Sequence, residues 1–227
     1  MSVWYPSRMA SNKVMPAHLQ KLWDALRPEV LLLHERWLIY RQLFADSQHR
    51  VDLLNDSAST FFLVVEDVLF ESIQLGFARL GDPAQSGTGR NLTLESLLNE
   101  VKKRPQDAAL LAKLTVLLHK YRTECSKLKR IRNKKLAHLD RQTILGRKRL
   151  TNPSRNEIEH ALTTLRDFVN SFDLYFGIPE MAYEKMILRD DGNALVHVLK
   201  QGLRYRDLLK MRIIDWTDIQ KSRYYKA

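Results

Sequence analysis

The chain has 227 residues, of which 44% are hydrophobic, and its 37 Lys and Arg residues against 26 Asp and Glu residues leave a formal net charge of +11. The single cysteine, Cys125, excludes an internal disulfide and a metal site built on cysteines. No apolar run approaches the ~20 residues that a membrane-spanning helix needs, so we expect a soluble protein. The lone cysteine and an N-terminus unlike a signal peptide predict the reducing cytoplasm.

The excess of positive charge predicts a polyanionic partner. The sequence pI is near 9.8, which favours nucleic acid first and an anionic membrane surface second, because clustered cations release counterions from phosphates. An ordinary solvated surface is the alternative. Charge alone does not decide between them.

The first expected elements are an arm and a long helix. Residues 1–16 show no clear period and are predicted to form a mobile N-terminal arm. From Ala17 the apolar residues recur at spacings of three and four, which predicts an amphipathic helix through Trp23, Leu26, Val30, Leu33, Trp37, Tyr40 and Phe44. Pro28 lies within this helix and is expected to bend it or to delay its start.

A second helix is predicted over residues 52–80. Its residues 61–73 are apolar nearly all round, which suits a helix buried at the centre of the fold. The turn at residues 81–83 ends it, and a loop rich in Gly and Ser follows. Arg79 and Asp82 are expected to pair locally at this helix end.

Capping residues and apolar spacing predict the next helices. Thr93 caps a short helix over residues 94–103, and a long helix over 106–143 follows, with an inward stripe at Leu110, Leu114, Leu117, Tyr121, Cys125, Leu128 and Ile131. Ser154 and Glu157 form the capping box of another long helix, whose apolar residues are Ile158, Leu162, Leu165, Val169, Phe172 and Phe176.

The chain beyond Pro179 is mixed in composition and basic. Leu195 to Leu209 indicate one more helix, and aromatic residues alternate with cations near the end of the chain. Such aromatics stack on unpaired bases or dock on their own domain. We predict an all-α protein with a bundle of four to six helices in a domain over residues 17–179, and a basic C-terminal helical extension over residues 180–227.

A basic segment from Lys127 to Arg149 carries ten Lys and Arg residues and a single acid. Within it, Arg132 and His138 stand six residues apart. Histidine transfers protons near neutral pH and arginine grips phosphate, so the two suffice for RNA cleavage without a metal. The predicted catalytic residues are Arg132, His138 and Asn133, whose amide supports the pair. The cations expected to bind the RNA backbone are Lys127, Lys129, Lys134, Lys135 and Arg141.

Helix geometry sets a condition on this pair. Six residues at about 100° each leave Arg132 and His138 roughly 120° apart around a straight helix. They meet at one phosphate if the helix loosens near Lys135, if the arginine side chain reaches round, or if a second subunit faces the first across a two-fold axis. A symmetric cleft between two copies is the most economical of these solutions.

An acid that orients Arg132 is also predicted. Glu66 and Asp67 interrupt an apolar helix, where an unpaired charge is costly, so each is expected to meet an arginine such as Arg79 or Arg132, or a helix end. A structural ion pair or simple exposure is the alternative. No metal site and no cofactor are expected, because the histidines are scattered without ligand spacing.

The pattern of Arg132, Asn133 and His138 resembles the Arg-x4–6-His motif of the HEPN superfamily, the higher eukaryotes and prokaryotes nucleotide-binding domains. The segments similar to its AbiU-type abortive-infection branch are residues 23–44, 78–83 and 91–94. The resemblance covers residues 17–177. It implies an all-helical, HEPN-like homodimer. The active members of the superfamily are metal-independent endoribonucleases that serve as toxins or phage-defence effectors. The resemblance assigns Arg132 and His138 as the catalytic pair.

A non-catalytic function is the alternative. Arg132 and His138 would then lie on the surface of a charged helix, in a helical module that binds RNA or a partner protein, such as an antitoxin or a regulator. That module predicts salt-sensitive binding without turnover. The leading prediction is a metal-independent endoribonuclease that acts on RNA, with His138 transferring protons, Arg132 binding the scissile phosphate, and no membrane partner.

Overall fold

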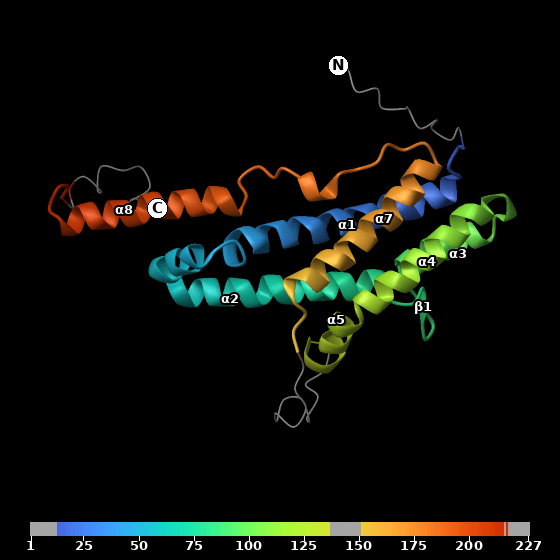
Figure 1. The fold of residues 1–227 in the computed structure, drawn as a ribbon, viewed down its shortest axis with the longest axis horizontal. Helices are drawn as coiled ribbons and strands as arrows, with labels where there is room; N and C mark the ends of the chain where they lie inside the picture. Colours follow the sequence, from blue (N-terminus) through green and yellow to red (C-terminus); the bar gives the residue numbers. More distant parts are fainter. Residues whose placement is uncertain (1–12, 137–150, 216, 218–227) are drawn as a thin grey trace, which may run out of the picture. The chain divides into compact units, whose positions relative to one another are not determined.

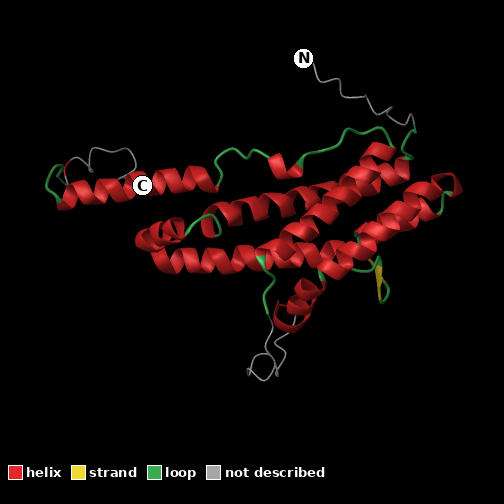
Figure 2. Ribbon diagram, viewed as in Figure 1, coloured by secondary structure: helices red, strands yellow, loops and turns green. Residues whose placement is uncertain are grey.

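A computed structural model describes residues 13–136, 151–215 and 217. Helices account for nearly all of their regular structure (Figure 2). The strands among them, β1 (Gln85–Ser86) and β2 (Gly89–Arg90), pair antiparallel as a small hairpin. The predicted all-α fold is confirmed.

The helical elements follow one another in an order close to the expected one (Figure 1). Their bounds are α1 Ala17–Phe44, α2 Gln48–Gly81, α3 Leu94–Lys102, η1 Pro105–Asp107, α4 Ala108–Glu124, α5 Ser126–Ile131, η2 Arg132–Leu136, α7 Arg155–Tyr175, η3 Tyr183–Lys185 and α8 Gly192–Lys210. The helix predicted over 195–209 is therefore present as α8. Pro28 lies inside α1 and does not delay its start.

Contacts between residues divide the chain into two compact units. The first holds residues up to Arg36 together with 71–186, and the second holds 37–70 together with the residues from Ile187 onward. The described residues from Ile187 onward thus group with the C-terminal end of α1 and the N-terminal part of α2. The domain boundary at residue 180 stays a prediction.

The first unit is organised around α4 and α7, which pack along each other, with α3 against α4. Phe168 and Phe172 of α7 are fully buried, and the Phe172 ring lies 5.2 Å from the ring of Trp23, centre to centre. Tyr121 of α4 is fully buried and donates a hydrogen bond of 2.9 Å to the carbonyl of Phe77. This bond attaches the C-terminal part of α2 to α4, which matters for the site below.

Capping residues start α3 and α7 where the sequence predicts. The Thr93 hydroxyl accepts a hydrogen bond of 3.3 Å from the backbone N–H of Ser96. The Ser154 hydroxyl accepts one of 3.3 Å from the Glu157 N–H, and the Glu157 carboxylate accepts one of 2.8 Å from the Ser154 N–H. Each cap satisfies N–H groups that have no partner within the helix.

The helix predicted over 106–143 is wrong as a single element. Cys125 leaves helical geometry at φ −81° and ψ 2°, and α5 turns away from α4 after it (Figure 1). Its side chain is buried, as are those of Leu128 and Ile131 on α5. The interruption keeps these apolar residues in the core while it redirects the basic residues between them.

The prediction that α2 is buried all round is also wrong. Phe62 is buried in the second unit with Leu43, Leu54 and Val196. The opposite side of α2 stays exposed, with 61% of Phe61, 56% of Val64 and 60% of Val68 accessible to solvent. A helix needs neighbours on every side to bury an apolar circumference, and the second unit covers only one side of this stretch.

A carboxylate is buried in the first unit. Neither oxygen of the Asp173 carboxylate, on α7, has a hydrogen-bond partner in good geometry among the described residues. Burial raises the pKa of Asp173 from 3.8 to about 6, and the nearby side chains of Arg27 and Trp23 lower this pKa only in part. The folded chain therefore holds a proton on Asp173 more tightly than the unfolded chain does.

Asp173→Asn should stabilise the protein, and more so at higher pH. Below about pH 4, Asp173 is protonated in both the folded and the unfolded chain, so its raised pKa does not lower the unfolding free energy. Above that pH the loss of unfolding free energy grows until the pH passes about 6. We expect the asparagine to increase the unfolding free energy by at most about 3 kcal/mol at pH 7.5, with little effect at pH 4. Urea unfolding at both pH values measures this, with the exposed Asp167→Asn on the same helix as control. Equal effects at the two pH values would contradict it.

Candidate functional site

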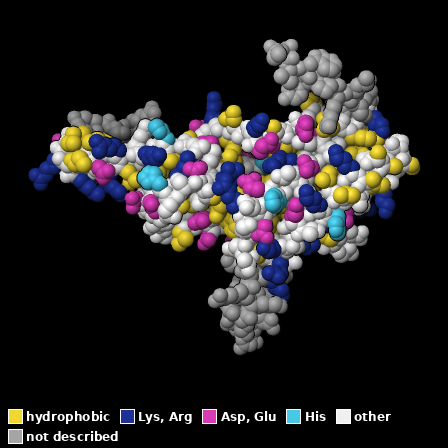
Figure 3. All heavy atoms as spheres, in the orientation of Figure 1, with side chains coloured by type: hydrophobic (Ala, Val, Ile, Leu, Met, Phe, Trp, Pro, Cys, Tyr) yellow, Lys and Arg dark blue, Asp and Glu magenta, His cyan; other side chains and the backbone are white. Residues whose placement is uncertain are grey.

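The basic segment begins on α5 and continues in η2. Figure 3 shows Lys and Arg side chains gathered over α5. Lys127 makes an ion pair with Glu157 on α7, which lowers the pKa of Glu157 to about 2. Lys129 reaches toward α2 instead, where its Nζ lies 3.3 Å from Oδ1 of Asp82. Two of the predicted RNA-binding lysines are thus held by acids of other helices.

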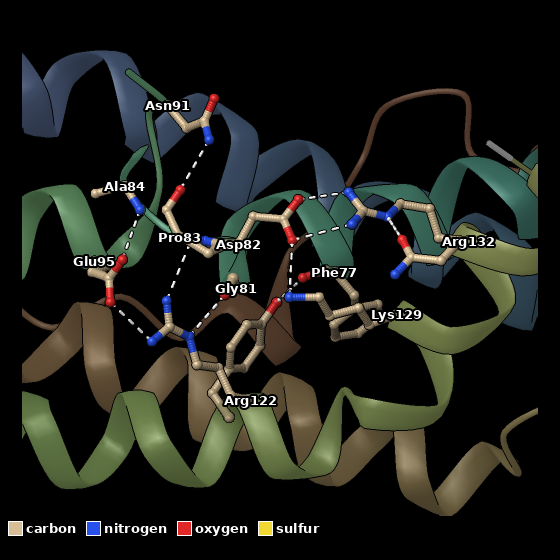
Figure 4. Close-up of polar contacts among 12 residues, drawn as sticks. Phe77, Gly81, Asp82, Pro83, Ala84, Asn91, Glu95, Arg122, Lys129 and Arg132 are labelled. Atoms are coloured by element: carbon tan, nitrogen blue, oxygen red, sulfur yellow. Dashed lines mark hydrogen bonds and ion pairs between the residues drawn. The ribbon is translucent and has the colours of Figure 1, made fainter. Parts of the chain in front are cut away.

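Arg132 is gripped by the same acid. Its Nη1 donates to Oδ2 of Asp82 at 2.6 Å and its Nη2 to Oδ1 at 3.2 Å (Figure 4). The planar guanidinium meets the planar carboxylate with two parallel bonds, a geometry that fixes orientation as well as distance. Both side chains are about one-fifth exposed, at 20% and 18%. The pair is therefore shielded from solvent but still reachable.

Asn133 completes the support of Arg132. The Nε of Arg132 donates to Oδ1 of Asn133 at 2.9 Å (Figure 4). A guanidinium has five N–H donors, and three of them are used by Asp82 and Asn133. The other two N–H groups of Arg132, one on each terminal nitrogen, have no hydrogen-bond acceptor among the residues that the structure describes.

The backbone around Asp82 is braced from α4. Nε of Arg122 donates to the Gly81 carbonyl at 2.8 Å and Nη2 donates to the Asp82 carbonyl at 3.3 Å (Figure 4). Nη1 of Arg122 donates to Glu95 at 3.0 Å, and the other carboxylate oxygen of Glu95 accepts from the Ala84 N–H at 2.7 Å. The Arg122 hydrogen bond lowers the pKa of Glu95, so the brace stays ionised near neutral pH. It holds the turn that aims Asp82 at Arg132.

The acid that orients Arg132 is thus Asp82, in the place predicted for Glu66 or Asp67. Glu66 accepts a hydrogen bond of 3.3 Å from the hydroxyl of Tyr40 within the second unit. Arg79 and Asp82 are joined at the helix end by a backbone hydrogen bond, in which the Asp82 N–H donates to the Arg79 carbonyl at 3.3 Å. The Asp82 carboxylate meets Lys129 and Arg132. A carboxylate at the C-terminal end of a helix faces the negative end of the helix dipole, so two cations from another element compensate it.

A π-helical turn carries the arginine. η2 spans Arg132–Leu136, where the backbone is wider than an α-helix. Such turns are rare and occur frequently at functional sites. This is the first of the three ways in which Arg132 and His138 were expected to meet. His138 and Arg141 lie outside the described residues, as does the side chain of Lys135.

Two further properties can be stated for the described residues, 13–136, 151–215 and 217. No three of their His, Cys, Asp and Glu residues lie together in a group that could hold a metal ion. None of their helices combines the length and the apolar character needed to cross a membrane.

Comparison with known proteins gives one result. The family model HEPN_AbiU2, described as AbiU2, matches residues 16–173, which is more than half of the chain. No curated protein and no solved structure matches the chain. At the level of the family, a HEPN-type nuclease or abortive-infection role follows, in agreement with the resemblance of the motif. The chain therefore belongs to the AbiU2 family of HEPN domains.

Proposed function

We propose that this protein is a cytoplasmic, metal-independent endoribonuclease of a toxin or phage-defence type. The observation that carries the proposal is the orientation of Arg132, which Asp82 and Asn133 hold with two N–H groups left for a phosphate. Family membership supports the reaction class. Sequence supplies His138 as the proton-transfer residue.

The reaction needs only the chain's own groups. His138 takes the proton of a ribose 2′-hydroxyl, whose oxygen attacks the adjacent phosphorus. Arg132 offsets the negative charge that grows on the non-bridging oxygens. The bond to the 5′-oxygen breaks, and a histidinium returns a proton to that oxygen, leaving a 2′,3′-cyclic phosphate and a 5′-hydroxyl. Lys129 and Lys134 are the described lysines nearest in sequence to Arg132 that attract the backbone.

A homodimer is part of this proposal. Two copies would supply two histidines and two arginines to one cleft. Phe61, Val64 and Val68 follow one another at spacings of three and four, so they share one face of α2, and each is more than half exposed. A second copy that pairs along this face would remove that apolar surface from water. We therefore assign this face of α2 to the contact between copies.

One observation favours the alternative function, a non-catalytic module. The fork of Arg132 is occupied by a carboxylate, as it would be in a purely structural ion pair. In that case the basic segment binds RNA, or an antitoxin or regulatory protein, through its charge alone. Catalytic cleavage of RNA by the purified protein separates the nuclease from the non-catalytic module.

Arg132→Ala and His138→Ala should each lower RNA cleavage by at least about 100-fold, because each removes a group that acts in the transition state. The purified dimer is assayed on cellular RNA in excess chelator, and product ends are analysed for cyclic phosphates. His119→Ala, a substitution of an exposed histidine on α4, is the control. Cleavage unchanged in both variants would reject the mechanism.

Asp82→Asn should lower kcat by about 10- to 100-fold. A misplaced Arg132 would stabilise the transition state much less, while its binding of the ground state would change less. KM and the unfolding temperature should change little. Asp46→Asn, which breaks a surface ion pair of 2.9 Å with Arg50, is the matched control. A faster Asp82→Asn enzyme would show that Asp82 blocks Arg132 instead of orienting it.

The double variant Val64→Glu/Val68→Glu should be monomeric, because a charged pair at the dimer contact cannot be desolvated cheaply. Light scattering on a sizing column measures the mass. Val116→Glu is the control, at another exposed valine, on α4. A dimer that persists in the double variant would assign the contact to another surface.

A further inference from the structure

A polar cavity lies beside the Arg132 site, within the first unit. Its volume is about 430 Å³, and it is formed by the end of α2, the hairpin, the residues leading into α3 and one residue of α1. The residues lining it are Glu29, Arg79, Leu80, Asp82, Ser86, Arg90, Asn91, Leu92 and Thr93. Asp82 belongs both to this wall and to the ion pair with Arg132. Asp82 therefore connects the cavity directly to the candidate catalytic arginine.

With Asp82 compensated by Lys129 and Arg132, the two arginines in the cavity lining outnumber its remaining acid, Glu29, so the cavity favours an anion. The carboxylate of Asp82 is turned to Lys129 and Arg132, which compensate it (Figure 4). Arg79 and Arg90 are exposed, and neither has an ion-pair partner within the described part of the chain. Two guanidinium groups around one cavity suit a phosphate, which each can grip with two hydrogen bonds.

The rest of the lining suits the remainder of a nucleotide. Leu92 is 41% exposed and offers an apolar surface for a base. Asn91 donates through Nδ2 to the Pro83 carbonyl at 2.9 Å (Figure 4), so its Oδ1 remains an acceptor. Glu29 adds a second acceptor, and the two match the amino group of a base.

The cavity wall is held in place by the brace already described. The Asn91 N–H donates to the Ala84 carbonyl at 2.8 Å, which closes the base of the hairpin. Glu95 and Arg122 fix the residues on the other side of that closure. A wall that is ordered before binding loses less entropy when a ligand arrives.

We propose that this cavity binds the nucleotide that flanks the scissile phosphate of the RNA, with Arg79 and Arg90 on its phosphate and Leu92 against its base. The assignment rests on the proposed function, because it places a second phosphate of the same strand next to the one at Arg132. Binding itself requires no cleavage, so the two proposals are tested separately.

The probe is a single-stranded RNA oligonucleotide methylated at every 2′-oxygen, which can bind but cannot be cleaved. Arg79→Gln and Arg90→Gln should each weaken its binding about tenfold and reduce the slope of log Kd against log salt by about 0.7, the value for one lost contact to a single strand. Arg79→Lys should keep the slope. Arg204→Gln, an exposed arginine on α8, controls for the loss of one charge.

The outcomes separate the two proposals. If the Arg79→Gln and Arg90→Gln variants both bind the oligonucleotide as tightly as Arg204→Gln does, the cavity assignment is overturned. This holds whether or not the protein cleaves RNA. A wild-type protein that never cleaves, but whose binding depends on Arg79 and Arg90, would reject the nuclease and keep the cavity. Adenosine monophosphate that competes as well as the oligonucleotide would assign the cavity to a free nucleotide and overturn the RNA assignment.

Discussion

The bidentate ion pair of Asp82 with Arg132 connects the end of α2 to the basic segment, and the site depends on it. Asp82 stands at a helix C-terminus, where its charge is unfavourable unless cations compensate it. Lys129 and Arg132, on α5 and η2, supply both compensating charges. These ion pairs hold the basic segment to the end of α2, together with the buried side chains of Leu128 and Ile131.

The Asp82 carboxylate lies beside the arginine that we propose to bind phosphate. Asp82 repels a phosphate, yet Asp82, Lys129 and Arg132 together carry one net positive charge. The group therefore still attracts an anion, provided that Lys129 stays in place. In the proposed function, Asp82 acts as a positioning residue for Arg132, and Lys129 offsets its repulsion of a phosphate. The same balance explains why a fork filled by a carboxylate is compatible with catalysis.

Local signals in the sequence were sufficient for much of the fold. The caps at Thr93 and Ser154 and the apolar stripe of α7 concern residues within one or two helical turns of each other. The pairing of Asp82 with Arg132 spans fifty residues, and no local pattern distinguishes it from a pair with Arg79. The break at Cys125 and the exposed face of α2 likewise depend on which neighbours are present. The sequence pattern predicts Arg132 as a site residue, whereas its pairing with Asp82 is seen only in the tertiary structure.

The turn over residues 81–84 links the two binding features physically. Its backbone is hydrogen-bonded to Arg122 and, through Ala84, to Glu95. The Asp82 side chain of this turn faces Arg132 and also lines the cavity. A ligand that pulls Arg79 or Asn91 inward therefore acts on the element that orients Arg132. A strand bound in the cavity would tighten the arginine, and a strand too short to reach it would not. We therefore expect occupancy of the cavity to affect the geometry of Arg132 through Asp82, which lines the cavity and pairs with Arg132.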